Sequence, residues 1–387
     1  MNSDGILTAH SSASDPRRAI QELHAALAGP DSELILFFCS SHFDLDVVAA
    51  EFNRLFPDTQ VLGCTTAGEI GPGGYLTHSI SGVGFSSGSC RVACGIVEDL
   101  AQVDDGSAQE LTDRLKDQLT AKVPAVYPEK SFALMLVDGL SGSEEMLARE
   151  FQASMGQIPV FGGSAGDDLA FEETRVFFGG RFRSDCAALI LFQTDLPFLV
   201  FRTQHFKATE ERLVVTEADA NNRIIHEING RPATEEYARL IGTTAAELSP
   251  EKFSQSPVVV LIDGADYVRS IQKGNPDGSL KLYCAIDEGV VLRVARGFDL
   301  VGNLEQTFGS IRDVIGPPRF TLACDCILRS LEIDQSGIKD VVGEVFHRNN
   351  TVGFSTYGEQ YGGIHVNQTL TGISIGGLAM PYGGGDQ

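Results

Sequence analysis

The chain has 387 residues, of which 43% are hydrophobic, and a formal net charge of −23 at pH 7. This length can bury two sizeable cores, and the composition is that of a globular protein. The acidic charge argues against nucleic acid or an anionic membrane as a partner, because a phosphate-binding surface needs clustered Lys and Arg. The sequence contains no apolar run of about 20 residues and no signal-peptide pattern, and its eight cysteines are too dispersed for a disulfide framework, so we expect a cytoplasmic protein with reduced thiols.

The N-terminal segment contains one predicted helix. Asp15 is a suitable N-cap, Pro16 suits the first helical turn, and Gly29 follows the end of the apolar pattern. Residues 1–29 are therefore interpreted as a tail and a helix. Strands are then expected at 34–39, 60–64, 80–86, 90–97, 133–138, 175–178 and 187–192, and helices at 44–56, 108–119 and 143–152.

The second half begins after a long predicted strand at 198–207. Further strands are expected at 212–216, 224–228, 258–262, 280–286, 290–296, 320–324 and 351–354, and helices at 232–241, 304–314 and 338–347. Hairpins mixed with strand–helix–strand units predict an α/β fold (mixed α+β) with mixed sheets. No low-complexity linker is present, so we expect two rigidly packed domains at residues 30–209 and 210–387.

A short pattern occurs twice, once near each end of the chain. Gly63–Glu69 and Gly353–Glu359 both read G-x-[ST]-T-x-G-E, and in both copies a [ST]-x-[ST]-G segment begins sixteen residues after the first glycine. This spacing predicts an internal duplication in which both copies adopt strand, helix, strand, turn and strand. A protein built from two related domains tends to hold a ligand near their interface.

The repeated motif and a glycine-rich segment each allow two interpretations. Glu69 and Glu359 either stabilise tight turns, which we favour, or face a shared cleft. The glycine-rich residues 161–168 resemble an anion-binding loop only weakly, because they lack the lysine of a P-loop and the dinucleotide fingerprint.

Cysteine chemistry has little support in the sequence. Cys324 and Cys326 flank Asp325, and strand alternation would place the two thiols on one face as small apolar residues and the carboxylate on the other. A zinc site would need two further ligands nearby. Cys64 is a conceivable nucleophile, but the sequence ties no histidine to it.

The strand at 198–207 carries the most interesting histidine. Period-2 geometry would place Phe201, Thr203, His205 and Lys207 on one face, which combines an apolar wall, an imidazole and a cation. These are the ingredients of a haem pocket. The alternative is a hydrogen-bonded histidine between the domains, which the residues alone favour.

Several segments together resemble a known family. The residues that carry the resemblance are 63–69, 161–167, 227–233, 356–361 and 365–369. They are similar to FIST-domain proteins over roughly residues 30–380, with a FIST N and a FIST C domain. The resemblance implies a sensory module for small ligands that works with signalling partners. Residues 203–206 and 365–369 look most similar to the NosP group of haem-binding nitric oxide sensors.

This resemblance implies a specific function without catalytic turnover. The cofactor would be non-covalent haem b, since no c-type attachment motif is present. His205 is the first candidate iron ligand, followed by His365 and then His42, and Phe201 and Lys207 would contact the haem. Nitric oxide would be the signal, and a histidine kinase that affects cyclic-di-GMP and biofilm behaviour would be the partner. The oligomeric state, including a homo-oligomer, stays open.

Two alternatives from other functional classes remain. One is a FIST-type binding module for an amino acid or another small metabolite, which would use the glycine-rich turns and Glu69 or Glu359. The other is a cysteine-dependent enzyme built on Cys64.

Overall fold

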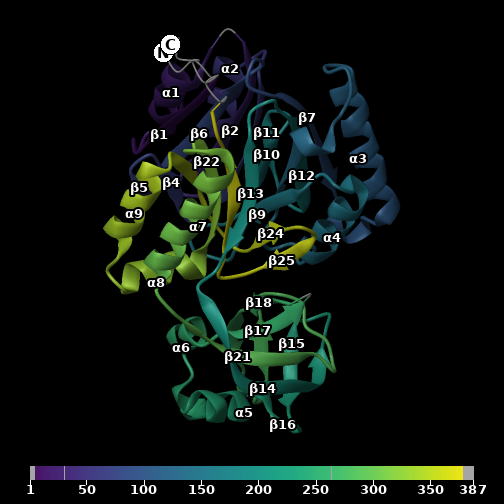
Figure 1. Cartoon of the computed structure of the whole chain (residues 1–387), viewed down its shortest axis with the longest axis vertical. Helices are drawn as coiled ribbons and strands as arrows, with labels where there is room; N and C mark the ends of the chain where they lie inside the picture. The colour runs from purple at the N-terminus through teal and green to yellow at the C-terminus, as the bar shows by residue number, and fades with distance from the viewer. Residues whose placement is uncertain (1–4, 30, 263, 378–387) are drawn as a thin grey trace, which may run out of the picture.

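The computed structural model describes residues 5–29, 31–262 and 264–377. They form a large body and a small domain, residues 206–297, which lies below the body in Figure 1. The body contains three six-stranded mixed sheets, and the small domain contains one eight-stranded antiparallel sheet. The predicted mixed α/β class is confirmed. Within the described part of the chain, no helix is both long enough and apolar enough to span a bilayer.

The body consists of three units, and the small domain is a separate fourth group of elements. Unit 1 contains β1 (Ile6–Ser11), α1 (Pro16–Leu27), β2 (Ser32–Ser40), α2 (Leu45–Leu55), β3 (Gln60–Thr66), β4 (Glu69–Gly71), β5 (Gly74–Leu76) and β6 (Ile80–Ser86). Unit 2 contains β7 (Arg91–Glu98), α3 (Asp105–Thr120), β8 (Ser131–Val137), α4 (Glu144–Met155), β9 (Val160–Ser164), β10 (Val176–Phe178), β11 (Arg181–Arg183) and β12 (Cys186–Gln193). Unit 3 contains β13 (Phe198–Thr203), α7 (Leu300–Ile315), β22 (Phe320–Cys326), α8 (Ile327–Gln335), α9 (Lys339–Arg348), β23 (Thr351–Thr356), β24 (Glu359–Tyr361), β25 (Ile364–Val366) and β26 (Leu370–Ile375). The small domain contains β14 (Phe206–Asp219), β15 (Ile224–Ile228), β16 (Arg231–Pro232), α5 (Ala233–Ile241), α6 (Pro250–Gln255), β17 (Val258–Ile262), β18 (Ala265–Arg269), β19 (Ile271–Gly274), β20 (Leu280–Leu282) and β21 (Val291–Gly297).

The three body sheets share one plan. Each has four strands from its own unit and a two-stranded hairpin from another unit. The orders are β1-β6-β2-β3 followed by β10-β11, β7-β12-β8-β9 followed by β24-β25, and β13-β26-β22-β23 followed by β4-β5. In every sheet the two strands next to the hairpin are parallel, so the hairpin of each unit completes the sheet of another unit. The body is therefore a threefold arrangement of similar units.

The two copies of the repeated motif occupy equivalent places in units 1 and 3. The predicted order of strand, helix, strand, turn and strand is confirmed for both copies. The structure adds a third unit of the same plan, in which the corresponding turn is part of the glycine-rich segment 161–168.

The turns of the three units interlock. After the second parallel strand of each unit, one backbone N–H donates to a backbone carbonyl of another unit. The three hydrogen bonds are Ala67 to Ser355 (3.0 Å), Gly166 to Thr65 (3.0 Å) and Tyr357 to Ser164 (3.3 Å). Together they link the three units in a closed ring. Buried polar backbone must be paired in this way. The ring ties the carboxyl ends of the parallel strands together at one end of the body.

Three equivalent glycines allow the parallel strands to pack closely. A Cβ at Gly63, Gly162 or Gly353 would lie 2.2, 2.0 or 1.8 Å from a backbone carbonyl oxygen of the neighbouring strand. These distances are far below van der Waals contact, so only glycine fits at these positions.

The core lies between the three sheets. Phe38 stacks on Phe354 at a centroid distance of 4.4 Å, and the same cluster includes Phe161 and Phe132. Helix pairs cover the outer faces: α1 and α2 on the first sheet, α3 and α4 on the second, and α7 and α9 on the third (Figure 1). Each helix buries one apolar stripe, as amphipathic helices in layered folds do.

The structure divides the chain differently from the predicted segments 1–29, 30–209 and 210–387. Residues 6–11 form edge strand β1, which pairs with β6, instead of a tail. The predicted strand 198–207 breaks at Gln204 and His205, because β13 pairs with β26 of the body while β14 pairs with β21 of the small domain. The small domain is thus inserted between the first strand of unit 3 and α7.

Candidate functional site

His205 lies at the connection between the body and the small domain. Its side chain is fully buried, its Nε2 lies 2.8 Å from Glu332 Oε1, and its Nδ1 lies 3.4 Å from Arg329 Nη1. Arg329 also pairs with Asp325 at 2.8 Å, and both side chains are completely buried. Asp325 in turn accepts a hydrogen bond from Tyr75 of unit 1. His205 therefore belongs to a buried polar network that joins three parts of the molecule.

This environment does not fit a haem. An axial histidine needs one free ring nitrogen and an open slot beside it. In His205 both ring nitrogens have protein partners, and the carbonyl accepts the N–H of Phe298 at 3.0 Å. Arg329 Nη2 and Glu332 Oε2 are buried beside the ring without a partner, and they are a cation and an acid, not the apolar walls of a porphyrin slot.

The two side chains expected beside His205 lie apart from it. Phe201 packs against Phe308 of α7 in the body core. Lys207 is exposed on β14, with its ammonium 4.7 Å from the ring centre of Phe298. The predicted common face is therefore wrong, because the chain passes from one sheet to another at His205 and the alternation of a single strand does not continue through it.

His365 lies in β25, on the side of the body that faces the small domain. Its ring is buried 3.4 Å from Gln360 Nε2, and its carbonyl accepts a hydrogen bond from Arg269 of the small domain. Burial, together with the charges of Arg223 and Arg269, lowers the pKa of His365 to about 3. The imidazole is therefore neutral at physiological pH.

His42 lies in the loop between β2 and α2 of unit 1. Its Nδ1 lies 3.1 Å from Asp168 Oδ2, which also accepts from the hydroxyls of Ser40 and Ser41. His42 and His78 are in edge contact and line a cavity of about 300 Å³. In the ranges that the structure describes, no three His, Cys, Asp or Glu side chains are placed to hold a metal ion.

The two motif glutamates are buried and hold their turns. Glu69 accepts hydrogen bonds from the hydroxyls of Thr66 and Ser79, and Glu359 accepts the corresponding bonds from Thr356 and Thr369. Burial raises the pKa of Glu69 to about 7 and that of Glu359 to about 8, although these hydrogen bonds act in the opposite direction. The turn-stabilising interpretation describes both residues.

The glycine-rich segment is not an anion cradle. The N–H groups of Ser164, Ala165, Gly166 and Asp168 all donate to backbone carbonyls of the protein. They are therefore unavailable to a ligand.

The cysteines are buried in the core instead of at a site. Cys64, Cys324 and Cys326 are free and buried, and burial raises the pKa of each thiol well above its usual value. Asp325 points away from the thiols into the His205 network, as strand alternation predicts. Protonated, inaccessible thiols are poor nucleophiles.

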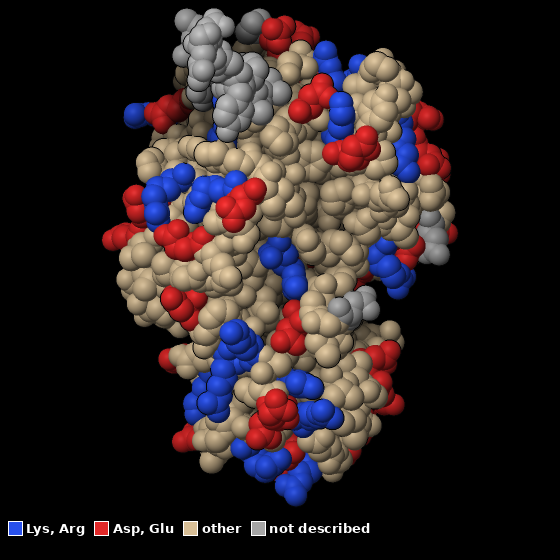
Figure 2. All heavy atoms as spheres, in the orientation of Figure 1, with Lys and Arg blue, Asp and Glu red and all other residues tan. Residues whose placement is uncertain are grey.

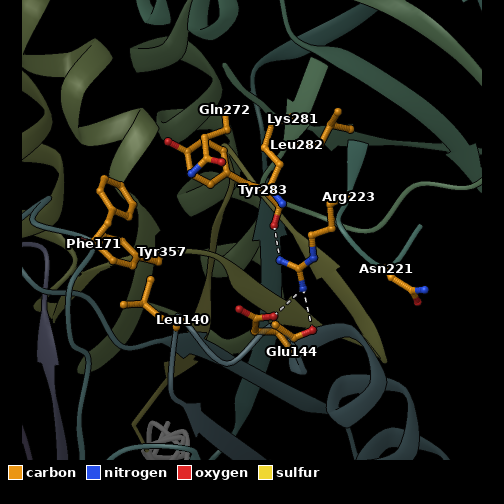
Figure 3. Close-up of a pocket in the computed structure, with 12 residues that line it drawn as sticks. Leu140, Glu144, Phe171, Asn221, Arg223, Gln272, Lys281, Leu282, Tyr283 and Tyr357 are labelled. Atoms are coloured by element: carbon orange, nitrogen blue, oxygen red, sulfur yellow. Dashed lines mark hydrogen bonds and ion pairs between the residues drawn. The ribbon is translucent and has the colours of Figure 1, made fainter. Parts of the chain in front are cut away.

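The candidate site is a cleft between the body and the small domain. The cleft has a volume of about 250 Å³. The body contributes the loop after β8 and the aromatic residues Phe171 and Tyr357, while the small domain contributes Arg223, Lys281 and Tyr283 (Figure 3). Gln272, Asn221, Leu282, Leu140 and Glu144 complete much of the lining.

Opposite charges face each other across the cleft. Arg223 Nη2 lies 2.8 Å from Glu144 (Figure 3). It also lies 3.2 Å from Glu145, and both acids are at the start of α4, where the helix dipole favours them. Burial raises the pKa of Glu144, and the charge of Arg223 opposes this rise. Lys281 adds a second cation, and burial lowers its pKa, with Arg223 acting in the same direction. The lining therefore combines two cations of the small domain with the Glu144 carboxylate of the body.

Aromatic rings form one wall of the cleft. Phe171 stacks on Tyr357 with a centroid distance of 4.5 Å, and the ring of Tyr283 lies 6.3 Å from Phe171 at an interplanar angle of 30°. Tyr283 belongs to the small domain, so these rings approach each other from the two sides of the cleft (Figure 3). The wall suits the apolar part of a small molecule.

The loop that carries Phe171 is under backbone strain. Asp168, Leu169 and Phe171 have φ values of +53°, +70° and +54°, which are uncommon for residues other than glycine. Asp167 holds the loop by accepting the N–H groups of residues 171–173 and the hydroxyl of Tyr357. Strain of this kind is concentrated at ligand-binding and switching segments.

None of the residues that line the cleft was predicted from the sequence as a site residue. They come from five separate segments, at 139–144, 171, 221–223, 272–283 and 357. One signal was present, because Tyr357 occupies the variable position of the repeated motif where unit 1 has Ala67. An aromatic residue at a turn whose counterpart carries alanine indicates a role outside the turn itself.

Comparisons with known proteins identify two family domains in the chain. The model of the FIST N domain matches residues 33–231, and the model of the FIST C domain matches residues 233–362. An uncharacterized protein of Methanocaldococcus jannaschii is 22% identical over 217 residues, which are 54% of this chain and 40% of that protein's length. A crystal structure of cyanuric acid hydrolase from A. caulinodans shares 10% identity with a TM-score of 0.30, covering 52% of this chain and 71% of that chain, and this likeness is too weak to carry an argument.

The boundary between the two family matches falls within the small domain, at residues 231–233. The FIST N match therefore includes unit 1 from β2 onward, unit 2, β13 and the first strands of the small domain, and leaves out β1 and α1. The FIST C match includes the rest of the small domain and unit 3 as far as β24. The chain belongs to the FIST family, whose domains are sensory modules in signal transduction.

Proposed function

We propose that this protein is a sensory module that binds a small zwitterionic metabolite, of the size and charge of an amino acid, in the cleft between the body and the small domain. The observation that carries the proposal is that Lys281 and the ion pair of Arg223 with Glu144 line the cleft, beside its aromatic wall. A carboxylate on the ligand would pair with Lys281. An ammonium group would lie towards the acids at the start of α4.

The size of the cleft supports a small ligand. A volume of about 250 Å³ lies below the roughly 300–1,000 Å³ of sites for drug-sized molecules. The ligand would contact both parts of the protein, so it would favour the arrangement in which the small domain is closed on the body. Such differential binding is what a sensor needs in order to shift its own conformation.

The proposal is tested by a thermal unfolding screen against the common amino acids and simple keto acids. A ligand that binds only the folded protein and is present at 100 times its Kd raises the stability by about 2.7 kcal/mol. We expect this effect for one chemical group of amino acids. Lys281→Ala should remove it, whereas Lys273→Ala should retain it, because Lys273 pairs with Lys281 on the adjacent strand but does not line the cleft.

The narrower prediction of a haem-based nitric oxide sensor has weaker geometric support. His205 would have to leave Glu332 and Arg329 before its ring could bind iron. Haem titration of the purified protein tests this prediction. A Soret band that forms with the wild-type protein, and is lost in His205→Ala but retained in His365→Ala, would reinstate His205 as an iron ligand.

The output of the sensor is proposed to be control of a partner histidine kinase, without turnover by this chain. The sensory role of FIST domains supports this proposal. Autophosphorylation of the purified kinase should change by roughly 5- to 150-fold when the ligand is present, which is the range of typical allosteric coupling. Equal kinase activity with and without the ligand would contradict a kinase partner.

A further inference from the structure

The outer face of the small-domain sheet carries an exposed apolar row. Val214 of β14, Val291 of β21 and Leu261 of β17 are 37%, 49% and 57% exposed. Val214 pairs directly with Val291. Val260 pairs with Leu292, so the next residue of β17, Leu261, stands opposite Val291. The three side chains therefore form a continuous row across three adjacent strands. Their neighbours in sequence, such as Leu213 and Leu292, point to the other face and form the domain core.

Two arginines stand beside this row on the same face. Arg212 pairs directly with Arg293 across β14 and β21, one alternation away from Val214 and Val291. Arg212 is exposed and Arg293 is partly exposed. Like charges directly opposite each other destabilise a sheet. Among the described residues, no acidic side chain is paired with either guanidinium, so the arrangement has no evident structural benefit.

We name these five residues the outer patch: Val214, Leu261, Val291, Arg212 and Arg293. Asp266 of the edge strand stands opposite Leu261, and its Oδ2 accepts the N–H of Ala208 at 3.4 Å. A second like-charge pair, Lys207 with Arg296, lies further along the same two strands, but Arg296 alternates with Leu292 and Val294 and therefore points to the other face of the sheet.

The distribution of charge over the whole chain makes this face unusual. Residues 206–297 contain 11 Lys and Arg and 14 Asp and Glu, a net charge of −3, which leaves −20 of the total −23 on the rest of the chain. Lys and Arg side chains gather on the small domain in the view of Figure 2, whereas acids are frequent around the body. The small domain is therefore the part of the molecule that repels an acidic partner least.

We propose that the outer patch docks an acidic protein whose own surface has an apolar centre. The apolar row would supply the buried centre of the contact, and Arg212 and Arg293 would pair with carboxylates at its rim. The strong negative charge of the body would repel an acidic partner elsewhere and so orient it towards the patch. The apolar row disfavours nucleic acid as the occupant, and the body charge disfavours an anionic membrane, whose extended surface would face the body as well as the patch. The proposal is independent of the ligand in the cleft.

The test uses defined probes with the full chain. A random copolymer of glutamate and tyrosine supplies carboxylates with apolar rings, polyglutamate supplies charge alone, and a single-stranded oligonucleotide and phosphatidylglycerol vesicles represent the other classes of partner. We expect the wild-type protein to bind the glutamate–tyrosine copolymer most tightly. The double variant Arg212→Ser/Arg293→Ser should weaken this binding roughly 10-fold or more, consistent with the loss of close charge pairs.

Matched variants separate the patch from total charge. Arg17→Ser/Arg114→Ser removes two exposed cations from the body and should leave binding unchanged. Leu261→Ser/Val291→Ser should remove the preference for the tyrosine copolymer over polyglutamate. The unfolding midpoints should stay the same or rise in the arginine variant, because a like-charge pair is lost.

Four results would overturn the proposal. They are absence of copolymer binding, equal losses in both arginine variants, tighter binding to the oligonucleotide or vesicles, and self-association in sedimentation that the patch variants abolish. The last result would assign the outer patch to a second copy of this chain.

Discussion

At the scale of single residues, burial decides what the polar side chains of this protein do. Glu69 and Glu359 were recognisable from a repeated motif, and their turn-stabilising role followed from the hydroxyls around them. The role of His205 could not be predicted from a sequence motif. Its partners Glu332 and Arg329 lie on α8, more than 120 residues away, and no local pattern brings them together.

The motif glutamates predict an unusual pH dependence. Their folded-state pKa values of about 7 and about 8 lie above the ordinary 4.5, so the folded protein holds more protons than the unfolded chain between these values. Their contribution to stability is therefore complete below pH 4.5 and is lost as the pH rises towards 8. Each unit of pKa shift corresponds to about 1.4 kcal/mol.

The measurement is urea unfolding from pH 5 to pH 8 for the wild type and for Glu69→Gln/Glu359→Gln. The difference between the two proteins isolates the glutamates from other groups. His365 acts in the opposite direction, because its lowered pKa removes stability as the pH falls below 6.5. We expect the wild type to lose stability relative to the variant as the pH rises. A difference that is independent of pH would show that the two carboxyls ionise normally.

His205 should be a structural residue. Removing its ring in His205→Ala leaves Glu332 and Arg329 without a shared partner in a buried site, which should cost about 1–3 kcal/mol of unfolding free energy. His10→Ala is the control, because His10 is exposed on edge strand β1. Unchanged stability of His205→Ala in chemical denaturation would contradict the role assigned to the network.

At the scale of elements, strands and helices with clear periodicity were predictable. Strands β6, β15 and β17 have the predicted bounds, and α2 and α3 differ by only a few residues at their ends. The third unit was not found, because its turn reads Gly-Gly-Ser-Ala-Gly-Asp and lacks the threonine and glutamate of the motif. Unit 2 has the same strand arrangement without the full motif, because close packing of the parallel strands requires only the glycine, Gly162.

The glycines at the parallel strands should tolerate no side chain. In Gly162→Ala the Cβ would lie 2.0 Å from the carbonyl oxygen of Met135, so the strands must separate, at a cost of about 1–3 kcal/mol or more. Gly309→Ala is the matched control on α7, where nothing lies within 4 Å of a Cβ. That variant should be stabilised by roughly 0.5–1 kcal/mol, because alanine favours a helix.

Thermal and chemical unfolding of both alanine variants check this prediction. Equal stability of Gly162→Ala and the wild type would mean that the parallel strands are not held as closely as the structure shows.

At the scale of the whole molecule, the inserted domain and the cleft beside it could not be predicted from the sequence. The duplication predicted a site between two halves, whereas the cleft lies between a body of three units and an inserted small domain. The insertion between β13 and α7 is invisible to periodicity, because β13 and β14 read as one continuous strand. Only the pairing of β13 with β26 and of β14 with β21 separates them.

Isothermal titration calorimetry tests most directly whether the interdomain cleft binds a small zwitterion through Lys281. The amino acid with the largest thermal shift is titrated into the wild type, Lys281→Ala and Lys273→Ala. We predict one site per chain in the wild type, at least a roughly 10-fold weaker Kd in Lys281→Ala for the loss of a charge-assisted hydrogen bond, and an unchanged Kd in Lys273→Ala. Equal affinity of all three proteins, or no binding of any amino acid to the wild type, would contradict the account.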